Sequence, residues 1–450
     1  MKNIVIFGAG RSSSVLIDYL LQESEKNNWQ ITLCDQSEEL ALAKLAGNKN
    51  GTAQGLDIHD ENTRDVLIMK ADLVISMLPV FLHTDVAKSC LKHGKNMLSA
   101  SYVNEDIRGM EKAVKDAGLL FIKECGLDPG IDHMTAMQAI DEIRAKGGRL
   151  TGFRSYTGGL IAPESDNNPW HYKFTWNPRN VVLAGKATAR YLRHGKYKYI
   201  PYHQLFTRTD RMSVEGYGDF DGYANRDSLA YRELYGIQDT TTILRGTLRR
   251  PGYCQAWQTL IDLGMTDDSF EIDSTPDMTY REFTNLFLRY DEGMTVEQKV
   301  CATTGIDENG EVFNALRWLG LFEEKPLPVA KGSPAHILQH ILEEKWTLKP
   351  EDKDMIVMQH IFDYELEGAV HRLTSSMVVQ GDDQVRTGMA KTVGLPLGIT
   401  AKLMLEGRIS LKGVHIPIHK EIYDPVLAEL ETLGMKFTDL HEIVDEPQTA

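Results

Sequence analysis

The sequence is poor in cysteine, in positive charge and in long hydrophobic runs, and each shortage excludes a class of protein. Its five cysteines are scattered and form no C-x-x-C pair, so we expect neither a disulfide framework nor a metal site. Lys and Arg number 49 against 64 Asp and Glu, and the resulting net charge of −15 disfavours nucleic acid and anionic membranes as partners. No apolar run reaches the roughly 20 residues that span a bilayer, and the glycine-rich start does not resemble a signal peptide. We therefore predict a cytoplasmic protein.

The composition is that of an ordinary globular protein. Hydrophobic residues make up 42% and charged residues 25% of the chain, which excludes a disordered or fibrous protein. A chain of 450 residues exceeds the size at which a single hydrophobic core keeps growing. Two or three domains are therefore expected.

The first part of the chain alternates short apolar runs with amphipathic stretches. This pattern is typical of a parallel sheet that is covered by helices on both faces. The predicted strands are 3–7, 30–34, 53–56, 73–78, 97–100 and 119–123, with helices such as 15–26 and 104–115 between them. Six such units predict an α/β fold with a Rossmann-type, doubly wound parallel sheet.

The strict alternation is lost after about residue 126, where a second domain is expected to begin. Residues 274–344 carry helical periodicity with little strand signal, which predicts a helical insertion. Strand patterns return at 354–363 and 371–379, and a pair of helices is predicted at 399–406 and 424–432.

The turn after the first strand has the form of a dinucleotide-binding loop. It reads Gly8-Ala9-Gly10-Arg11-Ser12-Ser13, which is G-x-G-x-x-[small] between a predicted strand and a predicted helix. Gly8 permits the tight turn, Gly10 lets the backbone approach a pyrophosphate, and the helix beginning near Ser12 directs its amide donors at that anion. Ser13 is small enough for the helix to pack on the strand. We predict that Gly8, Gly10, Arg11, Ser12 and Ser13 bind a dinucleotide cofactor.

The ends of three further strands supply the other predicted cofactor contacts. Asp35 ends the second strand, where an acidic side chain accepts hydrogen bonds from the adenosine ribose and repels a 2′-phosphate. No Arg follows within the next few residues, so NAD is favoured, with NADP as the alternative. Asp57 closes the third strand beside the adenine pocket, and Ser76, Leu78 and Pro79 close the fourth, near the nicotinamide ribose. Simple turns at strand ends would explain these residues equally well.

Seven ordered motifs carry the chemistry and a family resemblance. They are Ser101-Tyr102, Asp128-Pro129-Gly130, Gly158-Gly159, Asn225-Arg226-Asp227-Ser228, Gly246-Thr247-Leu248-Arg249, Thr392-Val393-Gly394-Leu395-Pro396 and Ser410-Leu411-Lys412-Gly413. Over nearly its whole length the chain resembles the saccharopine reductase family, the glutamate-forming saccharopine dehydrogenases. The resemblance implies interconversion of saccharopine with L-glutamate and 2-aminoadipate 6-semialdehyde by a nicotinamide-dependent enzyme of lysine metabolism. It also implies that the protein forms a homodimer and that it binds a small amino-acid substrate.

The same resemblance implies a domain plan and a set of site residues. Residues 1–127 with about 388–450 would form the Rossmann domain, about 128–255 with 345–387 an α+β substrate and dimerisation domain, and about 256–344 the helical insertion. The residues carried over to the saccharopine site are Ser101, Tyr102, Asp128, Arg226, Thr247, Leu248 and Arg249. One departure is Thr157, where the family often has a cysteine near the reacting centre.

Chemical reasoning gives these residues roles, each with a structural alternative. Asp128 is our first choice for acid–base catalysis, with Tyr102 assisting; Asp128 would otherwise simply cap the helix after Pro129. Arg226 and Arg249 suit the substrate carboxylates, although surface ion pairs would also explain them. His133 is expected to be a satisfied second-layer histidine. The aromatic residues Trp170, Tyr172, Phe174 and Trp176 are expected in a core or a dimer interface.

Two other functions remain open at this stage. The second enzyme hypothesis is a carboxynorspermidine-dehydrogenase-like enzyme, which condenses a diamine with a semialdehyde by the same imine chemistry but acts on substrates with fewer carboxylates. A non-catalytic dinucleotide sensor is the alternative outside the enzymes.

Overall fold

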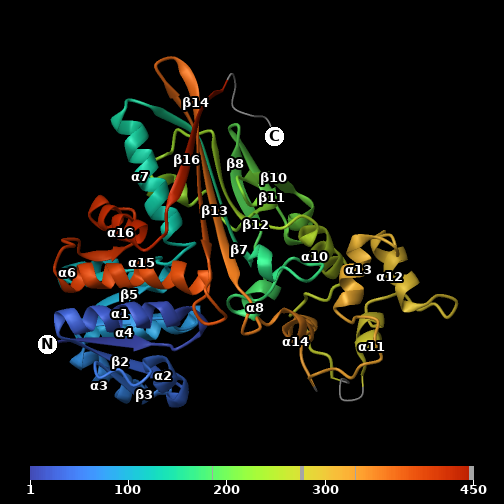
Figure 1. Ribbon diagram of the computed structural model, residues 1–450, viewed down its shortest axis with the longest axis horizontal. Coiled ribbons are helices and arrows are strands. Elements are labelled where there is room, and N and C mark those ends of the chain that lie inside the picture. Colours follow the sequence, from blue (N-terminus) through green and yellow to red (C-terminus); the bar gives the residue numbers. More distant parts are fainter. Residues whose placement is uncertain (185, 274–277, 330, 445–450) are drawn as a thin grey trace. The chain divides into compact units, whose positions relative to one another are not determined.

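The computed structural model describes residues 1–184, 186–273, 278–329 and 331–444 (Figure 1). The chain divides into two compact units, and each unit is built from two segments that are separate in the sequence. The first unit consists of Met1–Gly148 and Met377–Phe437, and the second of Arg149–Ser376 and the residues from Thr438 on. Helix α7 (Ile131–Ala145) therefore belongs by its contacts to the first unit, whereas the sequence-based domain plan places it in the second.

The first unit is built on a seven-stranded parallel sheet in the order β15-β6-β5-β4-β1-β2-β3. Its strands are β1 (Lys2–Phe7), β2 (Trp29–Asp35), β3 (Gly51–Gly55), β4 (Leu73–Ser76), β5 (Asn96–Ser99), β6 (Leu120–Ile122) and β15 (Gly413–His415). The six predicted strands are confirmed, and their order is that of a doubly wound dinucleotide-binding sheet. The seventh strand, β15, comes from the far end of the sequence.

Helices cover both faces of this sheet, and their ends follow local capping chemistry. They are α1 (Ser14–Asn27), α2 (Glu38–Leu45), α3 (Glu61–Lys70), α4 (His83–Lys92), α5 (Glu105–Gly109), α6 (Glu111–Asp116), α7, α15 (Gly388–Leu405) and α16 (Lys420–Thr432). Ser37, Asp60 and Asn104 cap α2, α3 and α5 by accepting hydrogen bonds from the first-turn amides. The predicted helix 104–115 is in fact two short helices that are interrupted at Met110.

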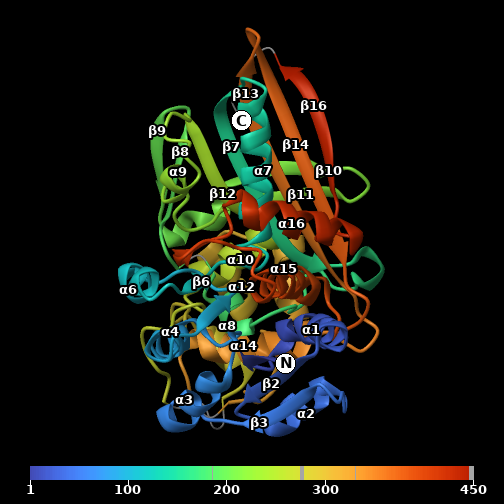
Figure 2. The same cartoon turned by 90° about the vertical axis from the view of Figure 1, so that its left-hand side faces the viewer.

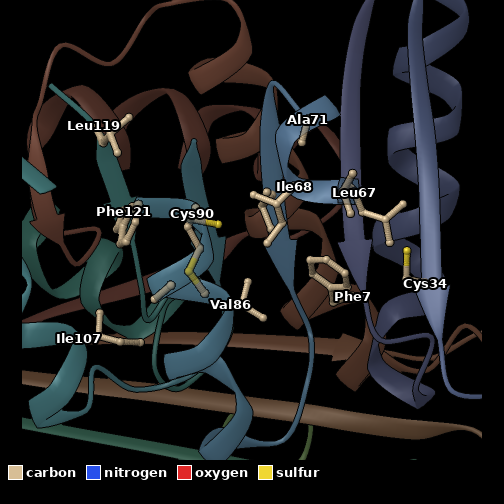
Figure 3. Close-up of a cluster of buried hydrophobic side chains, with 14 of the residues drawn as sticks. Phe7, Cys34, Leu67, Ile68, Ala71, Val86, Cys90, Ile107, Leu119 and Phe121 are labelled. Carbon is tan, nitrogen blue, oxygen red and sulfur yellow. The ribbon is translucent and has the colours of Figure 1, made fainter. Parts of the chain in front are cut away.

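One face of the sheet packs against α3 to α6 through a single apolar cluster (Figure 3). Phe7 and Phe121 reach it from the sheet, and Ile68, Cys90 and Ile107 reach it from the helices. All five side chains are at most 1% exposed. Burial of each large side chain contributes roughly 1.5 to 3 kcal/mol, so this layer holds the sheet edge in place.

On the other face, α1 packs against α15, which is the C-terminal segment of the chain (Figure 1). Two glycines one turn apart make this close approach possible. A Cβ atom on Gly394 would lie 2.6 Å from the backbone nitrogen of Leu16, and one on Gly398 would lie 2.6 Å from the ring of Tyr19. The helix that follows the nucleotide loop is therefore held by residues from the other end of the sequence.

The second sheet is mixed, with the order β10-β11-β12-β7-β13-β14-β16, and β8 and β9 attached beside β12 (Figure 2). Its strands are β7 (Arg149–Ile161), β8 (Ala189–Arg193), β9 (Lys196–Ile200), β10 (Thr209–Val214), β11 (Gly218–Ala224), β12 (Thr242–Arg249), β13 (Asp354–Leu366), β14 (Ala369–Gln380) and β16 (Phe437–Val444). Strand β7 pairs parallel with β12 and antiparallel with β13. This mixed sheet confirms the second, α+β part of the predicted fold class.

The helical part of the second unit lies between β12 and β13. It contains α10 (Tyr253–Asp262), α11 (Tyr280–Asn285), α12 (Val296–Thr304), α13 (Glu311–Trp318) and α14 (Pro334–Trp346), while α8 (Pro178–Val182) and α9 (Tyr231–Leu234) precede β12. Thr279 and Thr295 form capping boxes at the starts of α11 and α12. The helical stretch predicted from the sequence begins at Ser274, which lies outside the described residues.

Within the described part of the chain, no helix combines the length and apolar character needed to cross a membrane.

Candidate functional site

The loop between β1 and α1 has the geometry that a dinucleotide requires. Gly8 has a φ of +105°, and a Cβ atom there would lie 2.9 Å from the carbonyl oxygen of Met77, so only glycine fits. A Cβ atom on Gly10 would instead meet no atom within 4 Å. This open space beside the backbone of Gly10 is where the motif predicts a pyrophosphate, so the loop fits the cofactor.

The residues after Gly10 turn the chain into α1. Arg11–Ser13 form a 3-10 turn, and the α-helix starts at Ser14, two residues later than the sequence pattern suggests. Ser13 is buried, and its hydroxyl donates to the carbonyl oxygen of Gly10 at 2.8 Å. Arg11 is exposed and Ser12 half-buried. Ser13 thus occupies a buried position, which is where the motif predicts a small residue.

Asp35 connects β2 to the nucleotide loop. Its Oδ2 accepts a hydrogen bond from the amide of Ala9 at 2.7 Å, and its Oδ1 accepts one from the amide of Ser37 at 3.0 Å. A carboxylate has about four acceptor positions, so both oxygens can also receive ribose hydroxyls. The turn role and the cofactor role are therefore compatible in one side chain. Lys44, in α2, is a cation within electrostatic reach of Asp35.

Three other residues predicted at this edge differ in their surroundings. β3 ends at Gly55, so Asp57 does not close it as the sequence suggested; it is exposed and its Oδ1 accepts a hydrogen bond from the amide of His59 at 3.0 Å. β4 ends at Ser76, and Leu78 and Pro79 lie in the loop that follows rather than in the strand. The contact of Asp57 with the amide of His59 is that of a residue in a turn, which is the alternative that the sequence offered for Asp57.

Ser76 is the last residue of β4 and is joined to Ser101 through a histidine that sequence reasoning missed. Nδ1 of His83 lies 2.8 Å from Oγ of Ser76, and its Nε2 lies 2.7 Å from Oγ of Ser101. Burial, with a contribution from the charge of Lys123, lowers the pKa of His83 to about 3. The imidazole is therefore uncharged at neutral pH.

Lys123 directly follows β6 and is the second residue that sequence reasoning missed. Its side chain is fully buried, and its Nζ has no hydrogen-bond partner. Burial lowers the pKa of Lys123 to about 7, and the neighbouring Glu124 offsets only part of this effect. A lysine after an apolar strand was the available signal in the sequence.

Tyr102 and Asp128, the two predicted catalytic residues, lie side by side in the first unit. The phenol oxygen of Tyr102 is 3.4 Å from Oδ1 of Asp128. Asp128 is not the N-cap of α7: that position is Gly130, and the Asp132 carboxylate accepts the Gly130 amide at 2.6 Å. Gly130 has a φ of +151° and packs on the backbone of Gly126. The capping alternative for Asp128 is therefore wrong.

His133 is fully buried in α7, and its Nε2 lies 2.9 Å from Oε2 of Glu124. Glu124 in turn accepts the amide of Val103 at 3.0 Å, which fixes the loop that carries Tyr102. The expectation that His133 has its hydrogen-bonding needs satisfied is confirmed.

In the second unit, Arg249 lies in an aromatic cage rather than in a surface ion pair. Its guanidinium carbon is 5.0 Å, 5.2 Å and 5.9 Å from the ring centroids of Tyr172, Tyr253 and Tyr223. Arg249 is 5% exposed, and its Nη1 donates to the carbonyl oxygen of Leu248 at 2.8 Å. Its Nε and the hydroxyl of Tyr172 have no hydrogen-bond partner. A buried guanidinium group with an unbonded Nε is a group that an anion would stabilise.

The neighbours of Arg249 on β12 are set by close strand packing. Thr247 pairs in register with Thr157 of β7, and a Cβ atom on Gly158 would lie 2.7 Å from the carbonyl oxygen of Leu248. Leu248 is buried, and Thr247 is half-buried. The hydroxyl of Thr157 is buried and has no hydrogen-bond partner. The family resemblance predicts a cysteine at this position.

Arg226 differs from Arg249 because it is exposed and has a left-handed φ of +49°. The next two residues of the same motif make contacts within the fold. Asp227 forms an ion pair with Arg190, and the hydroxyl of Ser228 accepts a hydrogen bond from the amide of Arg245 at 2.8 Å. Of the predicted aromatic cluster, Trp170, Tyr172 and Phe174 are buried core residues, and Trp176 is half-buried. The core expectation was right for three, but it overlooked the contact of Tyr172 with Arg249.

Two models of known protein families match the chain. Residues 4–122 match the model described as the saccharopine dehydrogenase NADP binding domain, and residues 126–435 match the saccharopine dehydrogenase C-terminal domain. The chain belongs to the saccharopine dehydrogenase family. The family model and the loop geometry together make it a protein with a nicotinamide-dinucleotide-binding domain.

Individual family members match over almost the whole chain. The saccharopine dehydrogenase [NADP(+), L-glutamate-forming] of Schizosaccharomyces pombe is 33% identical, covering 99% of this chain and 100% of that protein. The enzyme of the same name from Saccharomyces cerevisiae is 35% identical, covering 96% of this chain and 97% of that protein. The mitochondrial alpha-aminoadipic semialdehyde synthase of Rattus norvegicus is 35% identical over 97% of this chain, but the chain spans only 47% of its length.

A solved structure agrees with this assignment. The apo saccharopine dehydrogenase (L-Glu forming) from Saccharomyces cerevisiae superposes with a TM-score of 0.88 at 31% identity, covering 98% of this chain and 100% of that one. Both the Rossmann-type sheet and the second mixed sheet are thus family features. The names of the two yeast relatives specify NADP(+), whereas the sequence pattern around Asp35 favours NAD.

Proposed function

We propose that this protein interconverts saccharopine with L-glutamate and 2-aminoadipate 6-semialdehyde. The observation that carries the proposal is the buried aromatic cage around Arg249, in a chain that the saccharopine dehydrogenases of two yeasts match over 97% or more of their own length. Saccharopine has three carboxylates, and a protein of net charge −15 needs localised guanidinium groups to bind it. The cage supplies one such group, already desolvated.

Arg249 is assigned to a substrate carboxylate. Folding has already removed water from the guanidinium group, so a ligand does not have to meet that free-energy cost. The unpartnered Nε of Arg249 and the hydroxyl of Tyr172 can each donate a hydrogen bond to a carboxylate. Thr247 and the backbone of Leu248 extend the same strand and are assigned to the same ligand. Arg226, being exposed, is assigned to an outer carboxylate, where its contribution is smaller.

Asp128 and Tyr102 are assigned to proton transfer. The bridging secondary amine must be neutral before the adjacent carbon can release a hydride, so a base has to remove one proton. A bound nicotinamide ring supplies the hydride acceptor for oxidation and the hydride donor for the reverse reaction. Loss of the hydride leaves a C=N bond; water adds to its carbon, and the C–N bond breaks to give the aldehyde and the amine of glutamate. Asp128 accepts a proton from the bridging amine and from the attacking water, and it returns one to the nitrogen as the C–N bond breaks, so that one proton is released overall. Tyr102 orients the carboxylate by its hydrogen bond.

NAD is our choice of cofactor, although the names of the yeast relatives print NADP(+). The carboxylate of Asp35 is held by the amides of Ala9 and Ser37 at the end of β2, where it meets an adenosine ribose. A 2′-phosphate placed there would face this negative charge. Lys44 is the nearby group that would favour NADP, but burial lowers its pKa and its Nζ is already bonded to the hydroxyl of Ser14.

The direct test is oxidation of saccharopine by the purified protein, followed at 340 nm with each oxidised cofactor. We expect reduction of NAD with saccharopine and, in the reverse direction, reduced-cofactor oxidation that depends on glutamate. A rate with a diamine in place of glutamate would indicate the carboxynorspermidine type of reaction instead. Cofactor binding without a rate for either substrate would overturn the enzymatic proposal.

A further inference from the structure

A hydrogen-bonded chain leads from the interior of the sheet to Ser101. Ser76 ends β4, His83 begins α4, and Ser101 follows the end of β5, so all three lie at the carboxyl edge where open α/β sheets bind ligands. The two contacts of His83 are 2.8 Å to Ser76 and 2.7 Å to Ser101. Ser76 is 0% and His83 1% exposed, whereas Ser101 is half-buried, so the hydrogen bonds lead from a water-free interior to a hydroxyl that a ligand can reach.

Because His83 is uncharged, it plays opposite roles in its two hydrogen bonds. A neutral imidazole has one N–H group and one acceptor nitrogen, so it donates to one serine and accepts from the other. If its Nε2 carries the proton, the hydroxyl of Ser101 keeps its own proton for a ligand. If Nδ1 carries it, Ser101 donates to the ring and presents only lone pairs. In both arrangements the oxygen of Ser101 is held at one point by Nε2.

We propose that His83 is a positioning residue of the dehydrogenase, which fixes the hydroxyl of Ser101 through Nε2 as a ligand contact at the sheet edge. The proposal deepens the proposed function and relies on it for its kinetic test. A purely structural interpretation holds that His83 only anchors the start of α4 to β4 through Nδ1 and Ser76. The two interpretations assign the importance to different ring nitrogens, so they can be separated.

Two conservative substitutions divide the two contacts. The amide group of asparagine occupies approximately the position of Nδ1, and that of glutamine approximately the position of Nε2. His83→Gln therefore keeps the bond to Ser101 and loses the bond to Ser76, while His83→Asn does the reverse. We expect His83→Gln to retain kcat/KM for saccharopine within about 3-fold, and His83→Asn to lose about 10- to 100-fold, as misplaced contacts do. Equal losses, or a larger loss in His83→Gln, would overturn the proposal.

A double-mutant cycle tests whether His83 acts through Ser101. If it does, Ser101→Ala should already lose the benefit, and adding His83→Asn should cost less than a further 3-fold. Multiplying effects would mean that His83 acts independently, and would contradict the proposal. Ser89→Ala is the matched control: Ser89 is another buried serine of α4, but its hydroxyl contacts Nε of Arg64 at 3.0 Å.

A measurement without substrate separates failure of this proposal from failure of the proposed function. The whole protein labelled with ¹⁵N-histidine reports the ring nitrogens of His83, which are assigned by their loss in His83→Gln. Ser101→Ala should shift the Nε2 resonance while Ser89→Ala leaves it unchanged. If the wild-type protein does not oxidise saccharopine, the function is wrong and this shift still tests the contact; an unshifted resonance overturns the contact itself.

Discussion

The phenol oxygen of Tyr102 lies 3.4 Å from Oδ1 of Asp128 at the carboxyl edge of the parallel sheet. Two loops place them there: the segment after β5 carries Tyr102, and the Asp128-Pro129-Gly130 turn follows β6. Glu124 braces the first loop by accepting the amide of Val103 at 3.0 Å, and it is itself bonded to the buried His133. The proposed catalytic pair is thus supported by a second layer of hydrogen bonds.

Removing the charge of Asp128 should slow the reaction more than it weakens binding. Asp128→Asn keeps the shape and loses the base, so we expect kcat for saccharopine oxidation to fall by about 100- to 10,000-fold. Tyr102→Phe, which removes the hydrogen bond to Asp128 and keeps its carboxylate, should cost less. Steady-state rates across pH 6 to 10 check this; unchanged kcat in Asp128→Asn would remove Asp128 from the proton-transfer role.

Arg249 should be sensitive to loss of its planar fork even when the charge is kept. Arg249→Lys loses bidentate recognition, and we expect KM for saccharopine to rise about 10- to 100-fold with a smaller change in kcat. Arg226→Lys is the comparison, because Arg226 is exposed, and its effect should be several-fold smaller. Equal effects at the two positions would contradict the assignment of the buried cage to a carboxylate.

Charge at Asp35 should decide the cofactor. Asp35→Ser removes the carboxylate that a 2′-phosphate would face, so kcat/KM for NADP should rise relative to that for NAD by about 10-fold or more. The ratio of the two rates at 340 nm, in parent and variant, is the readout. A parent protein that already prefers NADP would show that Asp35 does not repel the phosphate and would favour Lys44 as its contact.

The buried Lys123 should destabilise the folded protein in a pH-dependent way. Its native pKa of about 7 lies below the ordinary value of 10.5, so between these pH values the unfolded chain binds the extra proton and stability rises with pH. Lys123→Met should therefore be more stable than the parent at pH 6, by about 3 to 5 kcal/mol at most, and this advantage should shrink toward pH 10. Urea unfolding at both pH values measures it.

The control for Lys123 is Lys115→Met on α6, where the side chain is exposed. It should give a small difference from the parent that does not depend on pH. A pH-independent gain in Lys123→Met would indicate better packing alone, and would contradict the charge-burial explanation.

The contact between α15 and α1 should be intolerant of any side chain at Gly394. Gly394→Ala places a Cβ atom 2.6 Å from the backbone of Leu16, which cannot move without shifting α1, and we expect a loss of about 1 to 3 kcal/mol. Gly109→Ala is the matched control, because Gly109 also lies in a helix but its Cβ atom would meet no neighbour within 4 Å. That change should be neutral or slightly stabilising. Thermal unfolding compares the two.

The quaternary state remains a prediction that comes from the family resemblance. A homodimer should show a mass close to twice the 50.7 kDa of the chain in light scattering. A concentration-independent mass near 50.7 kDa would contradict it.

Features encoded locally could be predicted from the sequence. The apolar runs of the parallel sheet, the glycine loop after β1 and the role of Gly8 are set by short-range sterics and burial, and all are found as expected. Strand β15 escaped prediction because three residues, Gly413–His415, carry too little periodicity to be seen. The end of β4 was placed too late because the apolar run continues past Ser76 into the loop.

The candidate site was harder to predict from the sequence than the sheet, because its contacts join residues that are distant in the sequence. Nothing in the run Ser76 to His83 indicates that the imidazole bridges to Ser101. Tyr172 was assigned to a core from its aromatic neighbours, and only the folded strands bring its ring to Arg249. The capping interpretation of Asp128 failed because the proline-containing turn carries the chain two residues further before α7 starts at Ile131.

The packing of α15 on α1 has a consequence for biosynthesis. The helix behind the nucleotide loop gains its neighbour, and the parallel sheet its outermost strand, only after the ribosome has translated beyond His415. Until then, one apolar flank of the earlier residues of this unit stays uncovered while Arg149–Ser376 of the second unit are synthesised. Shortening the chain at its carboxyl end should therefore impair cofactor binding at the opposite terminus.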